Sequence, residues 1–228
     1  MMRTRARHVS GPALRRSREI TRAWLCEPPR VQLVVVPDWL ESRLSPPYSP
    51  AEATLIADAA VADTLRAVDA TPVARRVTEA LRGRGPGLLL RTSTPQVGPD
   101  LLADAAATLG RFDAVLGATE DGGWWAFGLR EPDGAAGLAS VTEAGPLALA
   151  ALRLGLRVAM LPTLRQVNTA ADALEVAQRC GPGGSFAPAV AEVRSAALAR
   201  ARAAALARMQ AAAVILVQPV NGRRRRAN

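Results

Sequence analysis

The alternation of short aliphatic segments with longer alanine-rich segments constrains the fold of this 228-residue chain most. The clearest aliphatic segment, Val31–Val36, has the β-branched composition of a buried parallel strand. Further strands are expected at residues 88–90, 113–117, 124–129 and 156–161. Helices are expected at residues 50–69, 73–81, 100–109, 146–154, 170–180 and 187–213. This order predicts an α/β fold with a mostly parallel sheet and helices on both faces.

The net charge of +9 is carried by the two ends of the chain. Residues 1–30 contain eight arginines and two acids, whereas residues 191–228 contain eight arginines and one acid. Residues 31–190 have a net charge of −4, which gives no overall basic surface for a nucleic-acid backbone. We therefore expect a disordered basic leader over residues 1–30, an α/β domain over 31–186, and an Ala/Arg-rich helix with a basic tail over 187–228.

Several reaction types are excluded by residues that the chain lacks. All 29 basic residues are arginines, and His8 in the leader is the only histidine. Schiff-base chemistry, a phosphate-loop lysine and a nucleophile–histidine relay are therefore excluded. Cys26 and Cys180 have no neighbouring ligand for zinc and are expected to be free thiols. No apolar segment is long enough to span a bilayer or to form a secretory signal, so a cytoplasmic location is expected.

Ligands of open α/β sheets bind beyond the carboxyl ends of the strands. Four segments of this chain are expected there: residues 37–44, 92–96, 118–125 and 165–169. The third segment contains the turn Glu120-Asp121-Gly122-Gly123 followed by Trp124-Trp125. Its two glycines allow close approach of the backbone, and its two acids and two aromatic rings are suited to binding a sugar or a base. A plain hairpin with buried tryptophans is the alternative interpretation, and the sequence leaves both open.

Three segments also resemble a known family. Residues 93–128 resemble the family's stretch from an Asp-Thr-Pro-Gln motif to an Asp-Gly-Gly-Trp-Trp turn. Residues 145–172 resemble its last helix, its last strand and its Val-Asp-Thr loop, and residues 42–68 resemble its first helix. The family comprises bacterial glycosyltransferase-A-type proteins, often labelled arsenosugar-biosynthesis glycosyltransferases. The resemblance implies a nucleotide-diphospho-sugar-transferase-like fold, a nucleotide or nucleotide sugar as the partner, and Mg²⁺ or Mn²⁺ as the cofactor.

The chain departs from that family at the expected metal ligands. Ser93 and Asn168 stand where the family has aspartates, and neutral oxygens are weaker ligands for Mg²⁺ or Mn²⁺. Glu41 stands where a lysine is usual, which leaves Arg43 as the expected phosphate contact. The chain also resembles a truncated member, because a strand and a glycine-rich loop of the family have no counterpart between Arg75 and Leu88.

The resemblance suggests roles for the remaining residues. Asp121 or Glu120 would accept the proton of an acceptor hydroxyl or bind that hydroxyl. The expected substrate-binding residues are Gly122, Gly123, Trp124, Trp125, Arg43 and Thr94, with the tryptophans stacking on the acceptor. Two principal functions stay open: a transferase that uses a nucleotide-sugar donor, and a non-catalytic relative that binds or scaffolds. Weak nucleic-acid association through the arginine-rich ends is a third possibility.

Overall fold

The computed structural model describes residues 30–38, 40–72, 74–76, 85–132, 138 and 141–216. The expected basic leader, over residues 1–29, and the basic tail, over residues 217–228, lie outside the described residues. So do residues 77–81, the second half of one predicted helix.

A six-stranded sheet forms the centre of the molecule, with the strand order β2-β1-β3-β5-β4-β6. The strands are β1 (Val31–Val36), β2 (Ala74–Arg76), β3 (Gly87–Arg91), β4 (Ala114–Thr119), β5 (Trp124–Leu129) and β6 (Val158–Leu164). β5 runs antiparallel to its neighbours β3 and β4, whereas the other neighbouring pairs are parallel. This exception follows from the tight turn between β4 and β5, because a short connection joins only antiparallel strands. The predicted α/β fold is confirmed.

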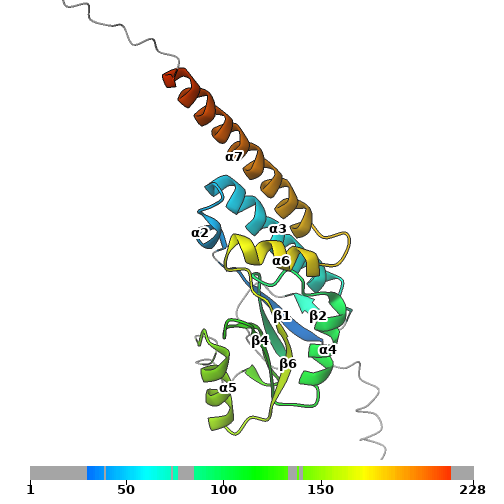
Figure 1. The fold of residues 1–228 in the computed structure, drawn as a ribbon. Coiled ribbons are helices and arrows are strands. Elements are labelled where there is room, and N and C mark those ends of the chain that lie inside the picture. The colour runs from blue at the N-terminus through cyan, green and yellow to red at the C-terminus, as the bar shows by residue number, and fades with distance from the viewer. Residues whose placement is uncertain are drawn as a thin grey trace, which may run out of the picture.

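Helices cover both faces of this sheet (Figure 1). On one face, α3 (Pro50–Asp69) and α4 (Pro99–Leu109) pack against alternate side chains of the strands, with Leu102 and Leu109 fully buried. On the other face, α5 (Ala144–Arg153) buries Leu147 and Ala151 against β4 and β5. The alternation of burial along each strand is the pattern that a sheet covered on both sides requires.

A third group of helices packs together beside the sheet. α2 (Leu40–Leu44), α6 (Ala170–Arg179) and α7 (Phe186–Leu216) share a core with α3. The carboxylate of Asp63 in α3 accepts hydrogen bonds from the backbone amides of Ser185 (2.7 Å) and Phe186 (3.1 Å) at the start of α7. This satisfies two amides that a helix start otherwise leaves unpaired. From this anchor α7 extends away from the body of the molecule (Figure 1). No helix among the described residues is long and apolar enough to cross a membrane.

Two sequence predictions are wrong in this region. Residues 74–76 were predicted as helix, but they form β2 and pair in parallel with β1, with Ala74 opposite Val31. The open edge of β1 offers backbone hydrogen bonds there, and such tertiary pairing overrides weak helical propensity. Residues 40–44 were predicted as loop, but they form α2 because Leu40 and Leu44, one turn apart, are both fully buried. β2 ends at Arg76, within the interval from Arg75 to Leu88 where a strand was expected to be missing, and residues 77–84 of that interval lie outside the described residues.

Glu52 joins the start of α3 to α7 and gives the first testable prediction. Its carboxylate accepts two hydrogen bonds from Arg200 (2.7 and 2.8 Å) and completes a capping box with Ser49. Hydrogen bonds from Arg200, and then from Ser49, lower the pKa of Glu52 to about 2. Because folding lowers the pKa of Glu52, its ionised carboxylate contributes to the free energy of unfolding. That contribution is complete at pH values above the ordinary pKa of 4.5 and is lost as the pH falls towards about 2.

We therefore expect Glu52→Gln to lower the urea midpoint of unfolding at pH 7, and this difference from the parent to vanish as the pH approaches about 2. Urea titrations at a series of pH values measure it. Glu192→Gln, at an exposed position of α7, is the matched control and should change little. A difference in urea midpoint that stayed constant down to about pH 2 would contradict the stabilising role of the ionised Glu52 carboxylate.

Candidate functional site

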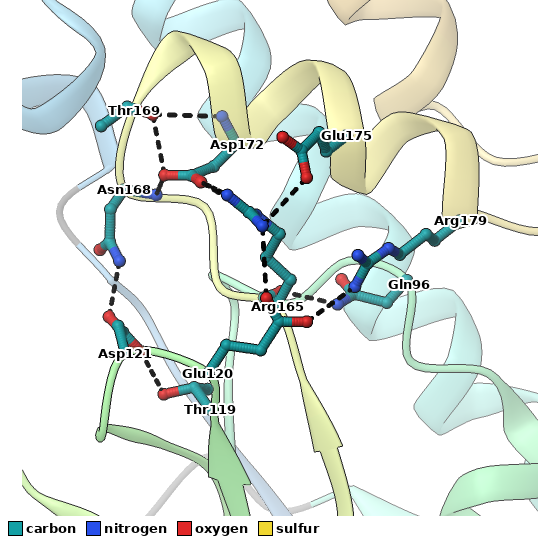
Figure 2. A network of polar contacts seen from close by, with 10 residues as sticks. All are labelled: Gln96, Thr119, Glu120, Asp121, Arg165, Asn168, Thr169, Asp172, Glu175 and Arg179. Atoms are coloured by element: carbon teal, nitrogen blue, oxygen red, sulfur yellow. Dashed lines mark hydrogen bonds and ion pairs between the residues drawn. The ribbon is translucent and has the colours of Figure 1, made fainter.

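The four segments predicted to follow the strands do meet at one edge of the sheet. The amide of Val167, after β6, donates to the carbonyl of Ser93, after β3 (2.9 Å). The amide of Glu120, after β4, donates to the carbonyl of Leu164 at the end of β6 (2.9 Å). Because β5 runs antiparallel, the turn before it lies at the same edge as the carboxyl ends of the parallel strands. Figure 2 shows the polar side chains that gather there.

The turn between β4 and β5 requires its two glycines. Gly122 has a φ of +90°, a conformation that side chains with a Cβ rarely adopt. A Cβ on Gly123 would lie 2.9 Å from Oγ1 of Thr119 and 3.3 Å from Oε1 of Gln166. Both glycines therefore have a backbone role, and they place Asp121 at the exposed tip of the turn.

Asp121 is held by short hydrogen bonds on both carboxylate oxygens. Oδ1 accepts from the Thr119 hydroxyl (2.5 Å), and Oδ2 accepts from Nδ2 of Asn168 (2.6 Å). Partial burial alone would raise the pKa of Asp121, but these bonds, with backbone amides of the turn, outweigh it and lower the pKa. Asp121 is therefore a carboxylate at neutral pH.

Asn168 links Asp121 to Arg43, a residue 125 positions away in the chain. Its Oδ1 accepts a hydrogen bond from Nη1 of Arg43 (2.6 Å) and another from Nε2 of Gln166 (3.2 Å). Three elements thus contribute to one series of hydrogen bonds: α2 gives Arg43, the loop after β6 gives Asn168, and the β4–β5 turn gives Asp121. We call this series of hydrogen bonds the Arg43–Asn168–Asp121 relay.

Glu120 belongs to a separate group of charges. Its carboxylate pairs with Arg165 (3.3 Å) and with Arg179 (3.0 Å). Arg165 also pairs with Asp172 (2.8 Å) and Glu175 (3.0 Å) on α6. Figure 2 shows Glu120 directed towards these arginines and Asp121 directed towards Asn168. The two adjacent acids of the turn therefore face different partners.

Both tryptophans of the turn motif are buried. Trp124 is 4% exposed and Trp125 is fully buried. Their Nε1 groups donate to the carbonyls of Val141 (2.8 Å) and Pro162 (2.9 Å), respectively. In this conformation neither ring is presented to solvent for stacking on an acceptor. The burial favours the alternative interpretation of a hairpin with buried tryptophans.

Ser93 and Thr94 are also fully buried. The Thr94 hydroxyl donates to the carbonyl of Arg91 (3.4 Å), so it closes its own turn. The Ser93 hydroxyl has no hydrogen-bond partner among the described residues. Of the predicted set, the structure thus brings Asp121, Asn168 and Arg43 into contact, and it places Ser93, Thr94 and both tryptophans in the interior.

The sequence analysis did not single out Asp38 or Asp172. Asp38 follows β1, is 8% exposed, pairs with Arg91 (2.7 Å) and accepts a hydrogen bond from the amide of Ser93 (3.1 Å). Asp172 accepts from the Asn168 amide (3.3 Å) and the Thr169 hydroxyl (2.8 Å). An acid directly after a buried strand, and an acid three residues after a helix-capping threonine, were the available signals.

Comparisons with known proteins give one family match and a similar solved structure. Residues 59–142 match the sequence profile of a family described as uncharacterized protein conserved in bacteria (DUF2064). No curated protein sequence matches the chain. Among solved structures, a proposed nucleotide-diphospho-sugar transferase from Desulfovibrio desulfuricans is similar with a TM-score of 0.61 and 15% identity, over 76% of this chain and 98% of that chain. The chain has the fold of a nucleotide-diphospho-sugar transferase.

A second similar structure is the Rv0371c protein of Mycobacterium tuberculosis in complex with manganese. The identity is 15% and the TM-score 0.37, over 64% of this chain and 97% of that chain. At 15% identity, the similarity to the Desulfovibrio structure concerns the fold of this chain and not its activity.

On this transferase-like fold, the relay places an exposed cation and an exposed carboxylate on either side of one amide. The carboxylate can accept a hydrogen bond from a hydroxyl group, and the guanidinium can donate hydrogen bonds to phosphate oxygens.

Proposed function

We propose that this chain binds a nucleotide-sugar donor at the carboxyl edge of its sheet and transfers the sugar to a hydroxyl acceptor. The observation that carries the proposal is the Arg43–Asn168–Asp121 relay, formed where nucleotides bind in open α/β sheets. The fold shared with a proposed nucleotide-diphospho-sugar transferase supports it.

In this proposal Asp121 acts on the acceptor and Glu120 does not. Asp121 is exposed, ionised and held on both oxygens, so it can orient an acceptor hydroxyl by accepting its hydrogen bond. Glu120 is paired with two arginines, whose positive charges neutralise it, whereas the side chains that hold Asp121 are the neutral Thr119 and Asn168. The two acids that the sequence offered as alternatives are thereby ranked.

One observation favours binding without turnover as a second candidate function. Hydrogen bonds lower the pKa of Asp121, and a weakly basic carboxylate is a poor proton acceptor at neutral pH. A relative that binds the donor and does not transfer its sugar would retain the relay and lack a strong base. Donor turnover separates the two candidates.

The test measures binding and turnover together. Calorimetry with UDP-sugars and GDP-sugars should detect donor binding, and nucleotide release in the presence of hydroxyl acceptors should detect transfer. We expect Asp121→Asn to lower turnover by about 100-fold while donor binding changes little, because the lost charge serves the acceptor. Asp104→Asn, at an exposed position in the middle of α4, is the control.

Three outcomes are informative. Turnover that depends on Asp121 supports the transferase. Binding without turnover for every donor and acceptor pair supports the non-catalytic relative. Turnover that is lost in Glu120→Gln and retained in Asp121→Asn would show that the ranking of the two acids is wrong.

A further inference from the structure

The relay raises the question of which cation, if any, neutralises the phosphates of a donor. The family that the sequence resembles is expected to use Mg²⁺ or Mn²⁺, and such ions prefer anionic oxygens as ligands. The side chains at this edge decide whether such an ion can be held. Within the described part of the chain, no three histidine, cysteine or acidic side chains are grouped in a way that would hold a metal ion.

The relay itself does not fit a metal ion. It contains one carboxylate, that of Asp121, and its other two side chains are the neutral amide of Asn168 and the cation Arg43. The Nδ2 group of Asn168 donates to Oδ2 of Asp121 (2.6 Å), so position 168 presents a hydrogen-bond donor where the resembled family has an aspartate. Hard divalent ions favour anionic oxygens, and an amide N–H directed at the carboxylate takes the place of such an ion.

The orientation of the Asn168 amide is fixed by its neighbours. Its oxygen receives hydrogen bonds from Arg43 and Gln166, and its nitrogen donates to Asp121. The reversed amide would set NH₂ against the guanidinium and oxygen against the carboxylate, and both contacts are repulsive. The guanidinium therefore polarises the amide towards Asp121.

Among the described arginines at this edge, Arg43 is the one without a carboxylate partner. Arg91 is paired with Asp38, Arg165 with Asp172 and Glu175, and Arg179 with Glu120. Among the described residues, the ion pairs do not include Arg43, whose side chain is exposed and donates to an amide oxygen. Most of its five N–H donors remain for a ligand, and their planar arrangement matches two phosphate oxygens.

We propose that Arg43, coupled through Asn168 to Asp121, takes the place of the divalent metal ion expected from the family resemblance, so that the site binds the diphosphate of a nucleotide without metal. This inference rests on the proposed function, because it concerns the donor of the same site. Arg43 binds the phosphate oxygens directly, and Asn168 holds Arg43 and Asp121 at a fixed separation.

The test measures the binding of UDP, GDP, ADP and CDP by calorimetry, once with EDTA and once with Mn²⁺. We expect at least one of these nucleotides to bind in EDTA, with an affinity that Mn²⁺ changes by less than about threefold. Arg43→Gln should weaken that binding by about 10- to 100-fold, the range expected for a lost charge-assisted contact. Arg43→Lys should restore part of it, because lysine keeps the charge without the planar fork.

Arg111→Gln is the control, because Arg111 is exposed and lies between α4 and β4, at the opposite end of β4 from the relay. Thermal unfolding of Arg43→Gln close to that of the parent would show that its loss of binding is not a loss of folding. Binding in EDTA that falls in Arg43→Gln and persists in Arg111→Gln supports the inference.

Two results would overturn it while leaving the proposed function intact: binding only with Mn²⁺, or equal binding by the parent and Arg43→Gln. Absence of binding by every nucleotide under both conditions would overturn the proposed function together with the inference.

Discussion

Gly117→Ala is expected to lower the free energy of unfolding by about 3 kcal/mol, the upper end of the usual range for overpacking a buried site. Gly117 lies in β4 directly under the indole of Trp125, and a Cβ added there would lie 2.3 Å from two ring atoms. That indole is fully buried and donates a hydrogen bond to the carbonyl of Pro162, so it has no free space to occupy. Urea or thermal unfolding measures the loss.

A matched control and a double mutant locate the cause. Gly145 lies in the first turn of α5 with nothing within 4 Å of an added Cβ, so Gly145→Ala should leave stability unchanged or raise it slightly. In a Trp125→Leu background the collision is absent, and adding Gly117→Ala should then cost less than about 1 kcal/mol. An equal cost of Gly117→Ala in both backgrounds would contradict the collision.

The sequence predicts most of the strands well because each of them is a short run of residues with a strand-forming composition of its own. The bounds of β1 and β5 agree with those expected, and β3, β4 and β6 differ by a few residues at their ends. The position of β2 could not be predicted in this way. Its residues, Ala74–Arg76, carry no strand signal, and they pair with β1 because the folded sheet leaves that edge open.

The candidate site was predicted as a place and not as a set of contacts. The rule for the carboxyl ends of strands located all four segments. Whether a tryptophan stacks on a ligand or fills the core depends on the hydrogen bond that its Nε1 finds, here at Val141 or Pro162. The contact between Arg43 and Asn168 spans 125 residues and requires α2, which the sequence does not indicate.

Asn168→Asp is expected to strengthen metal binding at the relay. The substitution sets a second carboxylate about 3 Å from Oδ2 of Asp121, where Nδ2 now lies at 2.6 Å. Two such carboxylates cannot both ionise freely, and a like-charge penalty of about two pKa units corresponds to about 100-fold in affinity for a cation that relieves it. We expect Mn²⁺ to bind this variant about 100-fold more tightly than the parent and to raise its thermal midpoint.

Asn168→Ala is the control for this prediction, since it removes the amide without adding a charge and should gain no affinity for Mn²⁺.

The double variant Arg43→Gln, Asn168→Asp tests the relay further. In the single variant, the guanidinium that now contacts Oδ1 of Asn168 would pair with the new carboxylate and compete with the metal ion. The double variant should therefore bind Mn²⁺ more tightly still, by about tenfold. Equal affinities in the single and double variants would show that Arg43 and the metal ion do not compete for one position.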